Sequence, residues 1–291
     1  MEEQARHLRE LFSAHRNASE RRAKSFTVTS GKGGVGKSNL ALNLSLAFAE
    51  LGRKVFLVDA DVHLANLDVL LGMKPDRTLR DFVLGECPLE EVIVQGPMGL
   101  SLVPASSGVT ELLMAEDRTW ARLEEALTAI EEEADVVVVD TAAGLSRGVL
   151  DMALSTDDVV IVTTPEPTAV VDAYAMVKVI SSQREEVPIH LVINRVRSQS
   201  EAEEVFGKLN QVIKHFLGLK VMFSGFVLED PRVSKAVAEQ RPFLLAYPGS
   251  KASSCVRRMA MRLSGMPEER KGSWIRRLSI LRNRNKGGME L

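Results

Sequence analysis

A glycine-rich stretch lies directly between an apolar run and a segment with helical periodicity. The apolar run is Phe26–Thr29, the stretch is Gly31–Ser38 (Gly-Lys-Gly-Gly-Val-Gly-Lys-Ser), and the helical segment is Asn39–Leu51. Glycines let successive backbone N–H groups turn toward one point, and the N-terminus of a helix adds partial positive charge there. The spacing Gly-x4-Gly-Lys-Ser therefore predicts a phosphate-binding loop between a strand and a helix.

Every residue of this loop is a candidate nucleotide contact. Lys37 would reach the β- and γ-phosphates, and the Ser38 hydroxyl would bind Mg²⁺. The full set is Gly31, Lys32, Gly33, Gly34, Val35, Gly36, Lys37 and Ser38. An incidental glycine-rich turn is the alternative, and the complete motif between strand and helix disfavours it. Lys32 is a second lysine that an ordinary phosphate loop does not need.

The rest of the chain alternates apolar, β-branched runs with segments of helical period. Strands are predicted at Phe26–Thr29, Val55–Val58, Leu100–Val103, Val136–Val139, Val159–Thr163, Ile189–Ile193 and Val221–Val227. Helices are predicted at Asn39–Leu51, Trp120–Glu133, Val170–Ser182, Ala202–Phe216 and Ser234–Gln240. This alternation predicts an α/β fold with a mostly parallel twisted sheet covered by helices on both faces. Ligands of such sheets bind at the carboxyl ends of the strands.

Acidic residues follow two of the predicted strands. Asp59 and Asp61 end the second strand, and Asp140 ends the fourth. A lone aspartate at a strand end is commonly a helix cap or a turn residue. With a phosphate loop at the same edge of the sheet, a role in holding Mg²⁺ and an attacking water is favoured, because Mg²⁺ needs few carboxylates beside water and phosphate oxygens.

Composition excludes several classes of protein. No stretch of about 18 uninterrupted apolar residues is present, so no spanning helix is expected. The charged N-terminus lacks an apolar signal region, which predicts a cytoplasmic protein. Cys87 and Cys255 lie far apart, so neither a disulfide framework nor a zinc or iron–sulfur site is expected. Basic residues gather in 251–291 while the preceding body is acidic, which indicates a local cationic element and makes a DNA partner unlikely.

Three motifs together resemble the MinD/ParA family of ATPases with a deviant Walker A loop, of the SIMIBI class of P-loop NTPases. They are Lys32–Ser38 (Lys-Gly-Gly-x-Gly-Lys-Ser), Val58–Gly72 (Val-Asp-Ala-Asp-x4-Asn-Leu-Asp-x-Leu-Leu-Gly) and Val137–Gly144 (Val-Val-Val-Asp-Thr-Ala-Ala-Gly). The resemblance implies ATP and Mg²⁺ as cofactors and a homodimer closed by ATP. It further implies that Lys32 crosses to the partner's nucleotide, that Asp61 positions the hydrolytic water, and that Asp59 and Asp140 support Mg²⁺.

Two further elements of the family are expected on the later strands. Val192–Arg195 resembles the adenine-reading end of a strand, which implies that Asn194 and Arg195 contact the nucleotide and that the Asn194 amide lies on the base. Gly225–Pro231 resembles the following base-contacting loop, although Leu228 stands where relatives usually carry proline.

The C-terminal segment is predicted to form a short amphipathic helix. Trp274, Leu278 and Leu281 share one face with Ile275 beside them, and arginines lie mostly outside this stripe. Such a helix suits an anionic membrane surface and resembles the targeting helix of MinD-like proteins. The alternatives are a disordered tail and a helix packed on its own domain, and the preceding Pro/Gly linker disfavours tight packing. The protein is therefore expected to lie on the inner face of the cell membrane as an ATP dimer.

The N-terminal segment resembles the Asp-Gln-Ala-x-x-Leu-Arg element of the FlhG (FleN) branch, which concerns flagellar number. Gln4, Ala5, Leu8 and Arg9 match, with Glu3 replacing the aspartate. The resemblance implies binding and activation of FlhF, a GTPase of the signal-recognition-particle type. Three parts are thus expected: an N-terminal helical extension (1–24), an ATPase domain (25–264), and a linker with the membrane helix (265–291).

The expected function is a membrane-associating, dimerising Mg·ATPase that regulates flagellar biosynthesis, with slow hydrolysis until a partner activates it. A flagellar basal-body or regulatory protein is a further expected partner. Three alternatives stay open. They are a MinD-type septum-site-determining ATPase, a ParA-like partition or DNA-associated regulator, and a nucleotide binder without useful turnover.

Overall fold

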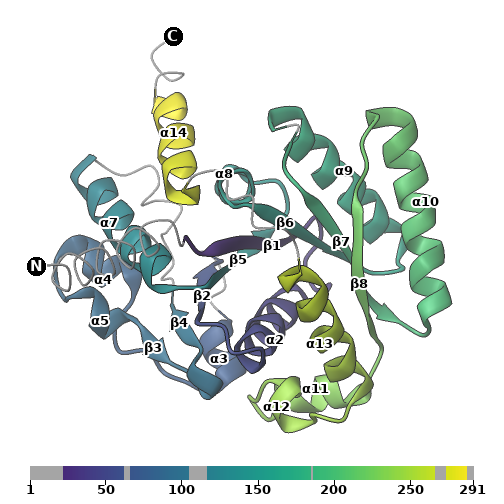
Figure 1. Cartoon of the computed structure of the whole chain (residues 1–291), viewed down its shortest axis with the longest axis horizontal. Helices are drawn as coiled ribbons and strands as arrows, with labels where there is room; N and C mark the ends of the chain where they lie inside the picture. The colour runs from purple at the N-terminus through teal and green to yellow at the C-terminus, as the bar shows by residue number, and fades with distance from the viewer. Residues whose placement is uncertain (1–21, 62–65, 105–116, 185, 266–272, 287–291) are drawn as a thin grey trace, which may run out of the picture.

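The computed structural model describes residues 22–61, 66–104, 117–184, 186–265 and 273–286. Eight strands form one sheet within these ranges, in the order β3-β4-β2-β5-β1-β6-β7-β8 (Figure 1). All neighbouring strands are parallel except β3 and β4. The strands are β1 (Lys24–Ser30), β2 (Val55–Ala60), β3 (Val94–Gln95), β4 (Ser101–Val103), β5 (Val136–Ala143), β6 (Asp158–Thr163), β7 (Ile189–Val196) and β8 (Met222–Leu228).

Helices cover both faces of the sheet. The first half of the described chain contributes α2 (Lys37–Glu50), α3 (Leu67–Leu71), α4 (Leu79–Leu84), α5 (Leu89–Val92), the 3₁₀ turn η1 (Pro97–Gly99) and α7 (Asp117–Glu133). The second half contributes α8 (Arg147–Ser155), α9 (Pro167–Gln183), α10 (Gln199–Leu217), α11 (Pro231–Ala238), α12 (Phe243–Ala246), α13 (Lys251–Ser264) and α14 (Trp274–Lys286). In Figure 1, α2 and α13 lie below the sheet, and α7, α8 and α9 lie above it.

The alternation of side chains along β5 separates the cores of the two faces. Val136 and Val138 belong to the cluster that packs on α2 and α13, whereas Val137 and Val139 belong to the cluster under α7. A third cluster joins α8, α9 and α10. Strands covered on both sides have to be apolar nearly throughout, which is why these runs could be recognised in the sequence.

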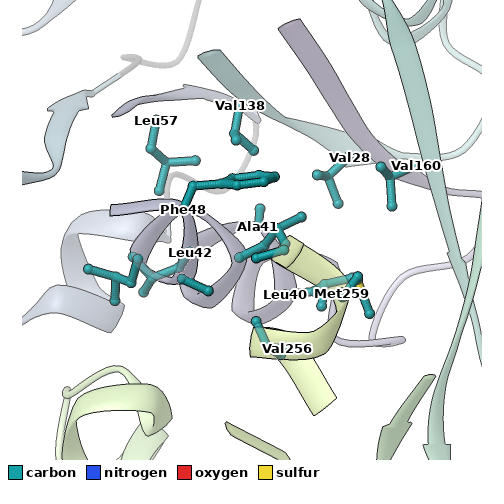
Figure 2. Packing of buried hydrophobic residues seen from close by; sticks show 14 of the residues in the cluster. Val28, Leu40, Ala41, Leu42, Phe48, Leu57, Val138, Val160, Val256 and Met259 are labelled. Carbon is teal, nitrogen blue, oxygen red and sulfur yellow. The ribbon is translucent and has the colours of Figure 1, made fainter. Parts of the chain in front are cut away.

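Helix α2 is the most enclosed element next to the phosphate loop. Phe48 points from α2 toward Leu57 and Val138 of the sheet, and Val256 and Met259 of α13 close the other side (Figure 2). Every residue from Leu40 to Phe48 is buried. Because its packed interior leaves little room for movement, α2 gives the loop that precedes it a rigid base.

The predicted fold class is confirmed. Each of the seven predicted strands and five predicted helices overlaps an element of the structure. The antiparallel β3 was missed because two residues carry no usable pattern. The helices α3, α4, α5, α8, α12 and α13 were also missed. Among the described helices, none is long and apolar enough to cross a membrane.

The C-terminal helix differs from expectation. In α14, Trp274, Ile275 and Leu278 are 1%, 2% and 1% exposed and pack into the core cluster beneath α7, while Leu281 is partly buried against the cluster of α8 and α9. The expected exposed apolar stripe is therefore covered by the protein itself in this structure. An amphipathic pattern shows only that a helix has to bury an apolar face. In α14 that face is buried against the protein's own core.

Candidate functional site

The phosphate loop lies between the carboxyl end of β1 and the start of α2. Two of its glycines have left-handed backbone, with φ of 80° at Gly34 and 90° at Gly36. At Gly31 an added Cβ would meet the backbone of Asp172 on α9, so this glycine is needed for close approach. The loop is therefore shaped by its own glycines and pressed against α9.

Lys37 and Asp140 form a buried ion pair under the loop. The Lys37 Nζ lies 2.8 Å from Asp140 Oδ1, and the two side chains are 7% and 1% exposed. The same ammonium donates a hydrogen bond of 3.3 Å to the Ser38 hydroxyl. Asp59 of β2 is the register partner of Asp140 on β5, which places both carboxylates at the same sheet edge. The predicted lysine, serine and two aspartates are thus brought together.

Burial raises the pKa of both aspartates. Burial and the Asp140 charge raise the pKa of Asp59 to about 7, although its Oδ1 accepts a 3.0 Å hydrogen bond from the Asp61 N–H. Burial likewise raises the pKa of Asp140, and Lys37 opposes that rise. Two buried carboxylates beside a hydroxyl suit a hard divalent cation, so Ser38, Asp59 and Asp140 fit Mg²⁺. No group of three or more histidine, cysteine, aspartate or glutamate side chains that could hold a metal occurs in the described residues, so phosphate and water oxygens would have to complete the shell.

Replacing Asp59 by asparagine is expected to stabilise the metal- and nucleotide-free protein, and more so at high pH. Since the folded pKa of about 7 exceeds the ordinary 3.8, the folded state keeps a proton that the unfolded chain loses. The stability contributed by this proton is complete below about pH 4 and is lost as the pH rises through about 7. Thermal unfolding in a chelator at about pH 5.5 and about pH 8 should show the larger rise in Tm at the higher pH. An equal rise at both would contradict the raised pKa.

Lys32 is held within its own chain. Its ammonium donates hydrogen bonds of 2.9 Å to Glu166 Oε2 and 3.1 Å to the Thr168 hydroxyl, both at the start of α9. Lys32 lowers the pKa of Glu166, and Arg195 adds to this effect. The pair is exposed, with side chains 40% and 59% accessible, so it is weak and can exchange partners.

Two adjoining cavities surround the loop. One, of about 590 Å³, is lined by the loop with Lys37, Ser38 and Asp61. The other, of about 530 Å³, is lined by Asn194, by the last two residues of β8 and by Glu229 and Asp230 after them. Arg195 lines both. Their combined size suits a nucleotide, with its phosphates in the first cavity and its base in the second.

Sequence reasoning missed several residues of this site. Glu166 and Thr168 bind Lys32 across more than 130 positions of chain, and no local pattern reveals such a contact. Val233 and Val237 line the second cavity and were not proposed, whereas Asp230 lies in the predicted base-contacting loop Gly225–Pro231. The Pro-Glu-Pro-Thr stretch after β6 was the available signal for the first pair. Gln4, Leu8 and Arg9 lie outside the described residues.

A glycine-rich loop at the carboxyl edge of a mostly parallel sheet, with a lysine–aspartate pair beneath it, defines a phosphate-loop nucleotide-binding protein. Comparison with known protein families narrows this class. The chain belongs to the CobQ/CobB/MinD/ParA nucleotide-binding family, whose domain model matches residues 26–243.

Individual relatives agree with this membership. The chain is 40% identical over 240 residues to the antiactivator FleN of Pseudomonas aeruginosa, covering 82% of this chain and 86% of that protein. It is 34% identical to the flagellum site-determining protein YlxH of Helicobacter pylori, covering 75% and 74%. The septum site-determining protein MinD of Pyrococcus horikoshii, solved with Mg-ADP, aligns with a TM-score of 0.68 and 26% identity over 84% of this chain and 96% of that one. The resemblance to the FlhG/FleN branch is confirmed.

Proposed function

We propose that the chain is a switch that binds ATP with Mg²⁺, closes as a homodimer, hydrolyses the ATP and regulates flagellar biosynthesis. One observation carries the enzymatic part. Beneath a complete phosphate loop, Lys37 and Asp140 lie 2.8 Å apart, and a second lysine is held loosely at the rim of the same loop. The family and the Mg-ADP complex of a MinD relative support the choice of ligand.

The residues divide the work of phosphoryl transfer. The loop N–H groups hold the phosphates, and Lys37 exchanges the Asp140 carboxylate for phosphate oxygens. Mg²⁺ bound by Ser38 and supported by Asp59 and Asp140 would neutralise phosphate charge. Asp61 lines the same cavity and orients the attacking water. Catalysis of this kind is mainly positioning and electrostatics.

Dimerisation depends on Lys32 changing partners. In this structure the lysine is bound to Glu166 and Thr168 of its own chain. A nucleoside triphosphate bound to a second copy of the chain carries more negative charge than one exposed carboxylate. Lys32 therefore leaves Glu166 and crosses the interface to that nucleotide. The dimer is then favoured only when ATP is bound.

Two substitutions test the cycle. Lys32→Ala is expected to bind ATP and to remain monomeric, and Asp61→Ala is expected to bind ATP, dimerise and turn over at least about tenfold more slowly. Light scattering with ATP gives the oligomeric state, and phosphate release gives the rate. An ATP dimer of Lys32→Ala would refute the crossing, and normal turnover by Asp61→Ala would refute the water-orienting role.

The flagellar assignment is supported by the relatives and by the N-terminal pattern. YlxH is named as a flagellum site-determining protein, and FleN gives its name to the branch that the N-terminal pattern resembles. Gln4, Leu8 and Arg9 match the element that this branch uses toward a GTPase. A peptide of residues 1–24 is expected to stimulate GTP hydrolysis by the FlhF-type GTPase of the same organism, and Gln4→Ala should abolish this. No stimulation of a competent GTPase would favour septum-site placement, since MinD of Bacillus subtilis is 31% identical over 91% of this chain.

Membrane association is the last part of the proposal and requires α14 to undock. The docked helix is held by several polar contacts. Glu131 of α7 accepts hydrogen bonds from the Ser273 hydroxyl and the Trp274 N–H, and Arg277 donates to the Ser155 carbonyl and to Asp157. Docking also carries a cost, because the buried Trp274 Nε1 has no hydrogen-bond partner among the described residues. An unsatisfied buried donor costs about 1–3 kcal/mol, which favours release.

A further inference from the structure

The Asn194 side chain lies against the phosphate loop. Its Nδ2 donates a 2.7 Å hydrogen bond to the Val35 carbonyl, and its Oδ1 accepts a 2.9 Å hydrogen bond from the Arg195 N–H. A carbonyl can only accept and a backbone N–H can only donate, so these two contacts fix the orientation of the amide. Both ends of the amide are therefore bound to the protein's own backbone.

The contact with Val35 determines where the next N–H points. In a trans peptide unit the C=O and the N–H point in opposite directions. The Val35 carbonyl accepts from Asn194, so the Gly36 N–H of the same peptide unit points away from Asn194. Gly36 also lines the cavity that the rest of the loop lines. Gly36 stands at the N-terminus of α2, where the N–H groups that receive a phosphate are found.

The fit between β7 and the loop is also steric. A Cβ added at Gly36 would collide with Asn194 Nδ2, and the residue has a φ of 90°. The amide thus occupies space that is free only because residue 36 is a glycine. Its hydrogen bond holds the Val35–Gly36 peptide unit in place. Arg195, with a φ of 58°, has left-handed backbone inside β7, where the register with β8 shifts, and its N–H donates to the amide oxygen.

We propose that Asn194 is a positioning residue of the phosphate loop: it holds the Val35–Gly36 peptide so that the Gly36 N–H faces the polyphosphate of the ligand. The inference rests on the proposed function, in that a nucleotide occupies this site. It changes the expected role of Asn194, whose amide was assigned to the base. Asn194 would then contribute to binding of the polyphosphate chain, whichever base is attached to it.

A ligand without a base separates the two roles. Asn194→Ala is expected to weaken binding of Mg²⁺-tripolyphosphate and of Mg²⁺-ATP alike, by about tenfold, as titration calorimetry can measure. Asn194→Asp should weaken both further, because a carboxylate oxygen would face the Val35 carbonyl. Leu228→Ala is the matched control. Leu228 lines the second cavity and not the first, so this variant should lose affinity for ATP and keep that for tripolyphosphate.

Hydrogen exchange of the ligand-free protein provides a second readout. Asn194→Ala should speed exchange in residues 31–38, and Leu228→Ala should not. The proposal is overturned if Asn194→Ala binds tripolyphosphate and exchanges like the wild type while its affinity for ATP, or its preference between ATP and GTP, changes. Wild-type protein that binds neither ligand would instead refute the proposed function, and the exchange measurement would still decide the role of Asn194.

Discussion

Replacing Lys37 by alanine is expected to lower the affinity for Mg²⁺-ATP by at least about a hundredfold and to destabilise the empty protein as well. The lysine neutralises Asp140, which is 1% exposed. Removing one partner of a buried pair leaves an uncompensated charge, at a cost of about 3–5 kcal/mol. Burial already raises the pKa of Asp140, and Lys37 opposes this rise, so the variant carboxyl should be protonated over a wider pH range.

The stability loss in Lys37→Ala should therefore be larger at about pH 8 than at about pH 5, because protonation removes the buried charge at low pH. Thermal unfolding without nucleotide at both pH values checks this. The double variant Lys37→Ala/Asp140→Asn is the control and should recover much of the stability without recovering ATP binding. A single variant as stable as the wild type at the higher pH would show that Lys37 does not compensate Asp140.

Freeing α14 is expected to make the protein bind anionic vesicles without nucleotide. The variant Glu124→Ala/Glu131→Ala changes α7 alone and leaves the helix sequence intact. Glu131 accepts hydrogen bonds from Ser273 and Trp274, and Glu124 accepts one from the Ser279 hydroxyl. Hydrogen bonds to charged groups contribute about 1.5–3 kcal/mol each, so losing them should raise the undocked fraction, and with it vesicle binding, at least about tenfold.

Charge alone would also favour anionic lipid, so the control has to match it. Glu125→Ala/Glu132→Ala removes two exposed carboxylates from the same helix and should leave vesicle sedimentation near the wild-type level. Limited proteolysis between α13 and α14 reports undocking independently. If α14 is released in the first variant and vesicle binding still equals that of the control, the helix is a structural element and the membrane proposal fails.

What the sequence could reveal depended on how far apart the interacting residues are. The loop from Gly31 to Ser38 and the buried strands have local patterns, so they were predicted. The pairing of Lys32 with Glu166 and the contact of Asn194 with Val35 each join positions more than 130 residues apart. The position of α14 was ambiguous for another reason, because an apolar helix face can bind a membrane or pack on the apolar surface beneath α7.

If α14 enters a membrane as proposed, its docking on the protein competes with its binding to lipid. The same three side chains, Trp274, Ile275 and Leu278, would enter lipid or the protein groove, but never both at once. The apparent membrane affinity is then the intrinsic affinity multiplied by the undocked fraction, so every ~1.4 kcal/mol of docking free energy lowers it about tenfold. Substitutions in α7 and α8, where α14 packs, would consequently change the apparent membrane affinity while the sequence of α14 and the nucleotide site stay unchanged.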